Sequence, residues 1–169
     1  MMKELLVLRH AKSSWDNAYL SDHERPLNNR GKADAPRMGK LLAREGIVPD
    51  LIISSTAERA MATAELVALA AGYERELVLT RQLYHADPED YLAVLAARGN
   101  GYGRVMVVGH NPGVEELVEM LTGEMVTMTT ANIAHIALPV MAWEAVTAVA
   151  EDASGKLLSH WRPKEVIGD

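Results

Sequence analysis

Short apolar runs alternate with longer segments of mixed character along the chain, and polar residues follow the end of each run. The first run, residues 5–8, holds four consecutive aliphatic side chains, a pattern typical of a strand buried on both faces of a parallel sheet. Other runs rich in aliphatic and β-branched residues predict further strands at 50–54, 77–79, 104–108, 131–138 and 143–151.

Helical segments separate most of these strands and are predicted at 29–44, 57–71, 88–98 and 113–121. The second of these segments is rich in Ala, Glu, Met and Leu and ends at Gly72, a residue suited to a helix C-terminus. In the first segment Asn28 or Asn29 is placed to cap the helix, while Pro36 predicts either a late start near Asp34 or a bend.

This order of elements predicts an α/β fold, a three-layer α/β/α sandwich around a mostly parallel central sheet. At 169 residues the chain is long enough to bury a sizeable core, and we expect a single domain over residues 1–169. The last two predicted strands have no helix between them, so they are expected to be partly antiparallel. The tail, 157–169, is expected to pack across an edge of the sheet.

Composition narrows the classes of function. The net charge of −6 argues against a nucleic-acid partner, because nucleic-acid binding needs a basic face. The chain has no cysteine, which excludes disulfides and thiolate chemistry and suits a reducing compartment. No apolar run approaches the roughly 20 residues of a membrane helix, and the N-terminus leads directly into a strand rather than a secretory signal. We therefore expect a cytoplasmic protein with neither nucleic acid nor membrane as partner.

Cationic or imidazole side chains follow three of the predicted strands. Arg9 and His10 end the first strand, Arg59 follows the second, and His110 follows the strand at 104–108. Ligands of open α/β sheets bind at the carboxyl ends of the strands, so these four side chains are expected to meet at one edge. A helical arginine is usually solvated, but Arg59 falls in the first turn of its helix, where the helix dipole favours anions.

Two guanidinium groups and two imidazoles predict a pocket for a phosphate-like dianion. A metal site is disfavoured because two arginines repel a cation and no acidic residues stand at ligand spacing, so no metal and no cofactor is expected. A serine nucleophile is disfavoured because the chain has no G-x-S-x-G segment. A neutral imidazole is a competent nucleophile toward phosphorus, and the arginines would stabilise charge on the transferred oxygens.

Three segments carry these residues: LRHA at 8–11, SSTAERA at 54–60 and VVGHNP at 107–112. Together they resemble the signature blocks of the histidine phosphatase (phosphoglycerate mutase-like) superfamily, with Ala11 at a position where glycine is usual. Within that superfamily, LRHAKSSW at 8–15 and ERPL at 24–27 closely resemble the short SixA-type phosphohistidine phosphatases. The resemblance covers nearly the whole chain and implies a phosphoglycerate mutase-like fold.

The resemblance also implies roles for individual residues. It implies His10 as the phosphate-accepting nucleophile, Arg9 and Arg59 as phosphate clamps, and His110 as the second imidazole of the pocket. Arg25 is implied as a further phosphate or substrate contact, although Glu24 and Arg25 could equally form a surface pair.

One departure from the superfamily bears on the substrate. Larger members supply a carboxylic acid that protonates the leaving oxygen, whereas here Asn111 follows His110 and the region 84–89 is short. An alkoxide leaves poorly without a proton, but imidazole is a far better leaving group. The expected function is therefore a metal-independent phosphatase that removes phosphate from phosphohistidine on a protein, a phosphotransfer domain or phosphocarrier, through phospho-His10. A phosphatase for small phosphomonoesters and a catalytically silent phosphohistidine-binding module remain as alternatives.

The other histidines and one tryptophan have structural interpretations. His23 and His85 are expected to be solvated loop residues, with lining of the pocket entrance as the alternative. His135 is expected in the core and His160 at the surface. Trp15 is expected to pack beneath the loop that follows the first strand and to shape the pocket wall.

Overall fold

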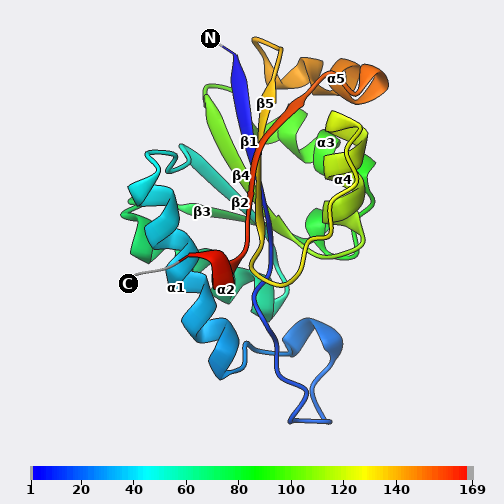
Figure 1. Ribbon diagram of the computed structural model, residues 1–169. Helices are drawn as coiled ribbons and strands as arrows, with labels where there is room; N and C mark the ends of the chain where they lie inside the picture. Colours follow the sequence, from blue (N-terminus) through cyan, green and yellow to red (C-terminus); the bar gives the residue numbers. More distant parts are fainter. Residues whose placement is uncertain (1, 167–169) are drawn as a thin grey trace.

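The computed structural model describes residues 2–166. A six-stranded sheet forms its centre, with the strand order β3-β2-β4-β1-β5-β6 (Figure 1). The strands are β1 (Lys3–Arg9), β2 (Leu51–Ser55), β3 (Leu77–Thr80), β4 (Arg104–Gly109), β5 (Ile133–Leu138) and β6 (Lys156–Trp161). The first four strands in this order are parallel, while β5 and β6 pair antiparallel at the other edge. The predicted α/β sandwich with a mostly parallel sheet is confirmed.

Helices cover both faces of the sheet. They are α1 (Asn29–Arg44), α2 (Glu58–Ala71), α3 (Pro88–Arg98), α4 (Gly113–Thr122) and α5 (Val146–Asp152). Figure 1 shows α1 and α2 on one side of the sheet and α3, α4 and α5 on the other. No helix within residues 2–166 is long and apolar enough to cross a membrane.

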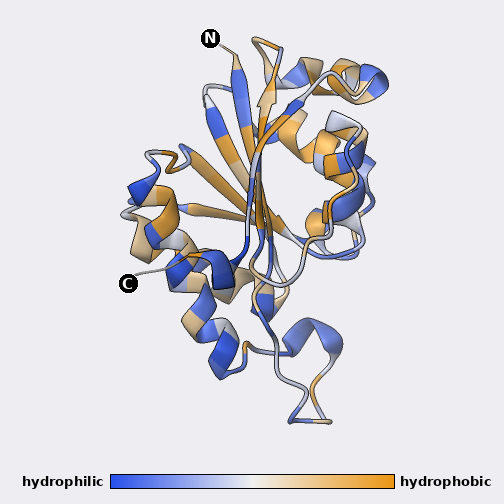
Figure 2. Cartoon of the chain, viewed as in Figure 1, coloured by the Kyte–Doolittle hydropathy of each residue, from blue (hydrophilic) through white to orange (hydrophobic). Residues whose placement is uncertain are grey.

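Apolar residues on both faces of the strands explain why the sheet is buried. In β1, Leu6 and Leu8 join the core cluster under α1 and α2, whereas Leu5 and Val7 join the cluster under α3 and α4. Successive side chains of a strand point to opposite faces, so a continuous apolar run supplies both layers at once. Figure 2 shows the apolar colouring concentrated on the central strands, with hydrophilic residues on the outer helix surfaces.

The long polar segment after β1 folds back on itself instead of crossing the sheet. Ser13 pairs with Leu27 in an isolated antiparallel bridge, and the backbone N–H of Asn28 donates to the carbonyl oxygen of Lys12. Between them lies the 3₁₀ turn η1 (Asp22–Glu24). This excursion extends beyond the sheet at the carboxyl end of β1 (Figure 1).

The region 143–151 is where the sequence-based prediction of a strand is wrong. It forms the 3₁₀ turn η3 (Trp143–Ala145) followed by α5, and the last strand of the sheet is β6 instead. Trp143, Val146 and Val149 are all buried and spaced three apart, so one helical face enters the core under α3 and α4.

The start of α1 and the C-terminal segment differ in how well they follow the sequence-based predictions. The helix α1 begins at Asn29 with Asn28 as its cap, so a late start near Asp34 is wrong and Pro36 lies inside the helix. Of the tail 157–169, residues 157–161 belong to the edge strand β6, while 167–169 lie outside the described residues.

Close packing of α1 against α2 gives a prediction about stability. A Cβ atom at Gly39 would collide with the carbonyl oxygen of Val67 and lie 2.7 Å from the Cβ of Ala70. We expect Gly39→Ala to lower the free energy of unfolding by about 1–3 kcal/mol despite the higher helix propensity of alanine, because the helices must separate. Gly103→Ala is the control, since its Cβ would meet only Asp50 at 3.5 Å. Urea unfolding of both variants measures the difference, and equal stabilities would contradict the prediction.

Candidate active site

Two imidazoles meet at the carboxyl edge of the sheet. His10 follows β1 and His110 follows β4, and these strands are parallel neighbours with Arg9 opposite Gly109. The two ring centroids lie 5.0 Å apart at an interplanar angle of 52°, and both residues are buried. Gly109 is required here because a Cβ atom would collide with the hydroxyl of Tyr91, which accepts a hydrogen bond from the backbone N–H of His110 at 3.3 Å.

The surroundings of His10 fix both its tautomer and its charge. Its Nδ1 lies 2.8 Å from the carbonyl oxygen of Ala11. A carbonyl oxygen can only accept, so Nδ1 carries the proton and Nε2 keeps its lone pair. Burial, reinforced by the charges of Arg59 and Arg9, lowers the pKa of His10 to about 4. The ring is therefore neutral at pH 7, with a free lone pair on Nε2.

His110 is held from the neighbouring strand. Its Nε2 lies 2.8 Å from the Oγ of Ser55, the last residue of β2. Burial, together with the nearby His10 and Arg59, lowers the pKa of His110 to about 3, so this ring is also neutral at pH 7. Its Nδ1 is buried and has no hydrogen-bond partner within the described chain.

Arg9 and Arg59 enter the pocket from β1 and from the first turn of α2. Arg9 donates to the carbonyl oxygen of Met128 at 3.0 Å. Arg59, itself buried, donates to the Oδ2 of Asp22 at 3.0 Å and to the backbone oxygen of the same residue at 2.6 Å. The Nε atoms of both arginines are buried without a partner in the described part of the chain. Unused donors on two guanidinium groups indicate a site for an anion.

Arg25 reaches the same pocket from the excursion after β1. Its guanidinium donates to the Oγ of Ser13 at 2.9 Å, pairs with Asp22 at 3.3 Å and lies 3.5 Å from the ring centre of Trp15. Arg25 is buried, and the Glu24 side chain instead accepts from Ser21. A surface pair between Glu24 and Arg25 is therefore wrong.

A hydrogen bond ties the loop of His10 to α2. The backbone N–H of Ala11 donates to the Oγ1 of Thr63 at 2.9 Å, and this hydroxyl in turn donates to the carbonyl oxygen of Arg59. The loop of His10 and the first turn of α2, which carries Arg59, are thus held in a fixed relation, although they lie about fifty positions apart in the chain.

All five predicted site residues line one pocket of about 220 Å³. The lining comprises Arg9, His10, Lys12, Ser13, Trp15, Asp22, Arg25, Arg59, His85, His110, Asn111 and Thr130. Trp15 shapes the wall, but it does so as a 74% exposed side chain, so the expectation that it packs beneath the loop is wrong. The sequence prediction that these distant segments meet is in agreement with the geometry.

Asp22 was not predicted as a site residue, yet it organises the cations. Its carboxylate accepts from Arg59, from Arg25 and from the hydroxyl of Tyr84, the last at 2.7 Å. Burial alone would raise the pKa of Asp22, but these hydrogen bonds and the charges of both arginines hold it well below its ordinary range. Asp22 is therefore an anion at neutral pH. Only its position in a long polar loop signalled it, because nothing in the local sequence shows which loop carboxylate turns inward.

The other histidines differ from one another. His135 is buried and lies 2.6 Å from Glu4, which confirms a satisfied core residue. His160 is half-buried on β6 and bonds Asn132. His23 is partly buried and forms a hydrogen bond with the Oγ1 of Thr56. His85 is exposed and lines the pocket, which agrees with the alternative prediction that it lies at the pocket entrance.

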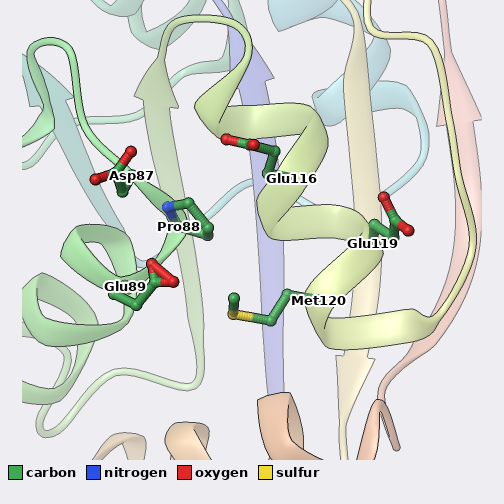
Figure 3. Close-up of a pocket in the computed structure, with 6 residues that line it drawn as sticks. All are labelled: Asp87, Pro88, Glu89, Glu116, Glu119 and Met120. Carbon is green, nitrogen blue, oxygen red and sulfur yellow. The ribbon is translucent and has the colours of Figure 1, made fainter.

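A larger hollow lies elsewhere and has the wrong charge for an anion. It measures about 570 Å³ between the start of α3 and α4, and Figure 3 shows its lining carboxylates. The lining consists of Asp87, Pro88, Glu89, Glu116, Glu119 and Met120. Four acidic side chains repel a phosphate. Over residues 2–166 no group of three or more His, Asp or Glu side chains is arranged to hold a metal ion.

Paired imidazoles and guanidinium groups at the carboxyl edge of a parallel sheet define an α/β protein with a pocket suited to phosphoryl groups. The family model of the histidine phosphatase superfamily (branch 1) matches residues 5–88. An uncharacterized chloroplastic protein of Arabidopsis thaliana is 32% identical over 164 residues, which is 92% of this chain and 75% of that protein. The chain belongs to the histidine phosphatase superfamily.

Solved structures place the fold more finely. SixA from Agrobacterium tumefaciens, a candidate phosphohistidine phosphatase, is 29% identical with a TM-score of 0.80, and the match covers 96% of this chain and 99% of that one. The protein histidine phosphatase SixA complexed with tungstate is 24% identical, also with a TM-score of 0.80, and covers 97% and 99% of the two chains. The fold is thus SixA-like.

The lowered pKa values of His10 and His110 predict how stability depends on pH. An unfolded imidazole titrates near pH 6.5, whereas these rings titrate at about 4 and about 3 in the folded protein. Between these values the unfolded state binds more protons, so stability falls as the pH is lowered from about 6.5 toward 4. We expect the urea midpoint to drop less between pH 7.5 and pH 5 in the double variant His10→Asn/His110→Asn than in the wild type. The same drop in both proteins would contradict the prediction.

Proposed function

We propose that this protein is a phosphatase that takes the phosphoryl group of its substrate onto the Nε2 of His10 and then releases it to water. The observation that carries this proposal is the tautomer of His10. A neutral ring with its proton held by the carbonyl of Ala11 directs a free lone pair from the floor of a cationic pocket. Membership of a superfamily of phosphatases and mutases supports the same chemistry.

Positive charge would position the phosphoryl group and stabilise its oxygens during transfer. Arg9 and Arg59 have donors that no described residue uses, and Arg25 adds a third guanidinium at the wall. His110 adds a neutral imidazole to the lining, held in place by the contact of its Nε2 with the Oγ of Ser55. Such a transition state spreads negative charge over three equatorial oxygens, and stabilising that charge is the main task of the site. The arginines would stabilise these oxygens, whereas His10 would make the nucleophilic attack.

The reaction would proceed in two displacements at phosphorus. The lone pair of His10 Nε2 attacks, and the bond to the leaving group breaks with its electron pair going to that group. Water then attacks phospho-His10, the P–N bond returns its pair to Nε2, and inorganic phosphate leaves. Splitting the reaction through a covalent intermediate replaces one difficult step by two easier ones.

Phosphohistidine on a protein is the substrate that we propose. No lining carboxyl group is protonated at neutral pH, because Asp22 is held as an anion, and imidazole departs with far less acid assistance than an alkoxide. The pocket of about 220 Å³ fits a phosphoryl group with the ring that carries it, rather than a whole metabolite. The likeness to SixA from Agrobacterium tumefaciens supports the same substrate class.

Replacement of the nucleophile tests the mechanism. We expect His10→Ala to abolish both turnover and trapping of an acid-labile phosphoenzyme from a ³²P-labelled phosphohistidine protein, because no other described imidazole combines a free Nε2 with this position. His160→Ala is the matched control, since His160 lies on β6 outside the pocket lining, and it should keep wild-type turnover. Phosphoenzyme in His10→Ala would refute the assignment.

The same assay separates substrate classes and tests metal independence. Activity should persist under chelator and should be higher on the phosphohistidine protein than on sugar phosphates. Preference for sugar phosphates would favour a small-ester phosphatase. Tight binding of the phosphoprotein without turnover would instead favour a silent binding module.

A further inference from the structure

A third imidazole, that of His85, lies at the mouth of the pocket, and the proposed binding of phosphate gives it no role. His85 lies between the 3₁₀ turn η2 (Arg81–Leu83) and α3, and it lines the same pocket as His10 and His110. Its side chain is 69% exposed, whereas the other two are buried. His85 therefore stands where a leaving group enters and departs, not at the floor where phosphorus is attacked.

Several contacts hold the His85 ring at this position. The ring packs on Tyr84 with centroids 3.9 Å apart, and its Nε2 lies 3.9 Å from the Oδ2 of Asp22. The same Asp22 oxygen accepts the Tyr84 hydroxyl at 2.7 Å, so the two aromatic residues share one anchor. The backbone of His85 has a φ of 55°, a left-handed conformation that is uncommon for residues other than glycine. A specific local fold thus turns this side chain toward the pocket.

A proton donor at this mouth would speed the departure of the leaving group, even of an imidazole that can leave with little assistance. In-line displacement places the leaving atom on the side of phosphorus opposite His10, which is the open side. Asp22 has no proton to give at neutral pH, and His110 is neutral and bonded to Ser55. Guanidinium and ammonium groups release protons too weakly near neutral pH, whereas imidazole exchanges them in this range.

We propose that His85 is the proton-transfer residue of this site, an inference that rests on the phospho-His10 mechanism. In the first step the protonated ring donates its Nε2 proton to the leaving oxygen or nitrogen as the bond to phosphorus breaks. In the second step the neutral ring takes a proton from the attacking water while the P–N bond to His10 breaks. The ring ends protonated again, so atoms and charge balance over one turnover. Proton donation to a leaving oxygen would also allow activity on phosphate esters, but phosphohistidine remains the better substrate because imidazole depends less on the donated proton.

The variant His85→Asn tests this role, because asparagine tolerates the left-handed backbone but carries no exchangeable acid proton. We expect kcat/KM to fall several-fold at most on p-nitrophenyl phosphate, whose leaving group needs no proton. On phenyl phosphate we expect a fall of about 100-fold, within the range of general acid catalysis. Asp22, Tyr84 and His110 face His85 and remain in place.

Two further measurements make each outcome decisive. Glu89→Gln, an exposed change in the first turn of α3 outside the pocket lining, should keep the wild-type ratio of the two substrates. Burst release of p-nitrophenolate shows whether His85→Asn still phosphorylates His10. An equal loss on both substrates would overturn the assignment of His85 while leaving the nucleophile intact. Absence of phospho-His10 in the wild type would instead overturn the proposed function.

Discussion

Parallel pairing of β1 with β4 is the constraint on which the pocket depends. With Arg9 opposite Gly109, the residues that follow each strand leave the sheet side by side, and the two imidazoles meet without any long loop to bring them together. The same register lets the backbone N–H of His10 donate to the carbonyl oxygen of Gly109. A shift by one residue would turn one of the rings toward the opposite face, because side chains alternate along a strand.

A second constraint is electrostatic. Three guanidinium groups converge in a protein whose net charge is −6, and their mutual repulsion favours separation. Asp22 offsets this repulsion by bonding Arg59 and Arg25 together. The excursion after β1 thus supplies both a cation and the anion that holds the cations in place, which explains why this segment is long and polar.

The sequence predicted the parts of the site that regular structure positions. Arg9, His10 and His110 follow strands whose apolar runs are unmistakable, and Arg59 follows a strand at the start of a well-formed helix, so topology alone brings these residues together. Asp22, Tyr84 and His85 lie in turns and loops whose conformation depends on tertiary contacts. The local sequence does not reveal these contacts. The region 143–151 is helical for a related reason. Its aliphatic and β-branched residues fit both the periodicity of a helix and that of a strand, and the packing of Trp143 in the core decides between the two.

The carboxylate of Asp22 also has a consequence for the last step of the proposed reaction, the release of inorganic phosphate. A negative charge paired with Arg59 lowers the net positive charge of the pocket, so a released phosphate ion is bound less tightly than three unpaired guanidinium groups would bind it. The counterion that holds the arginines together would thereby also limit product inhibition of the proposed reaction.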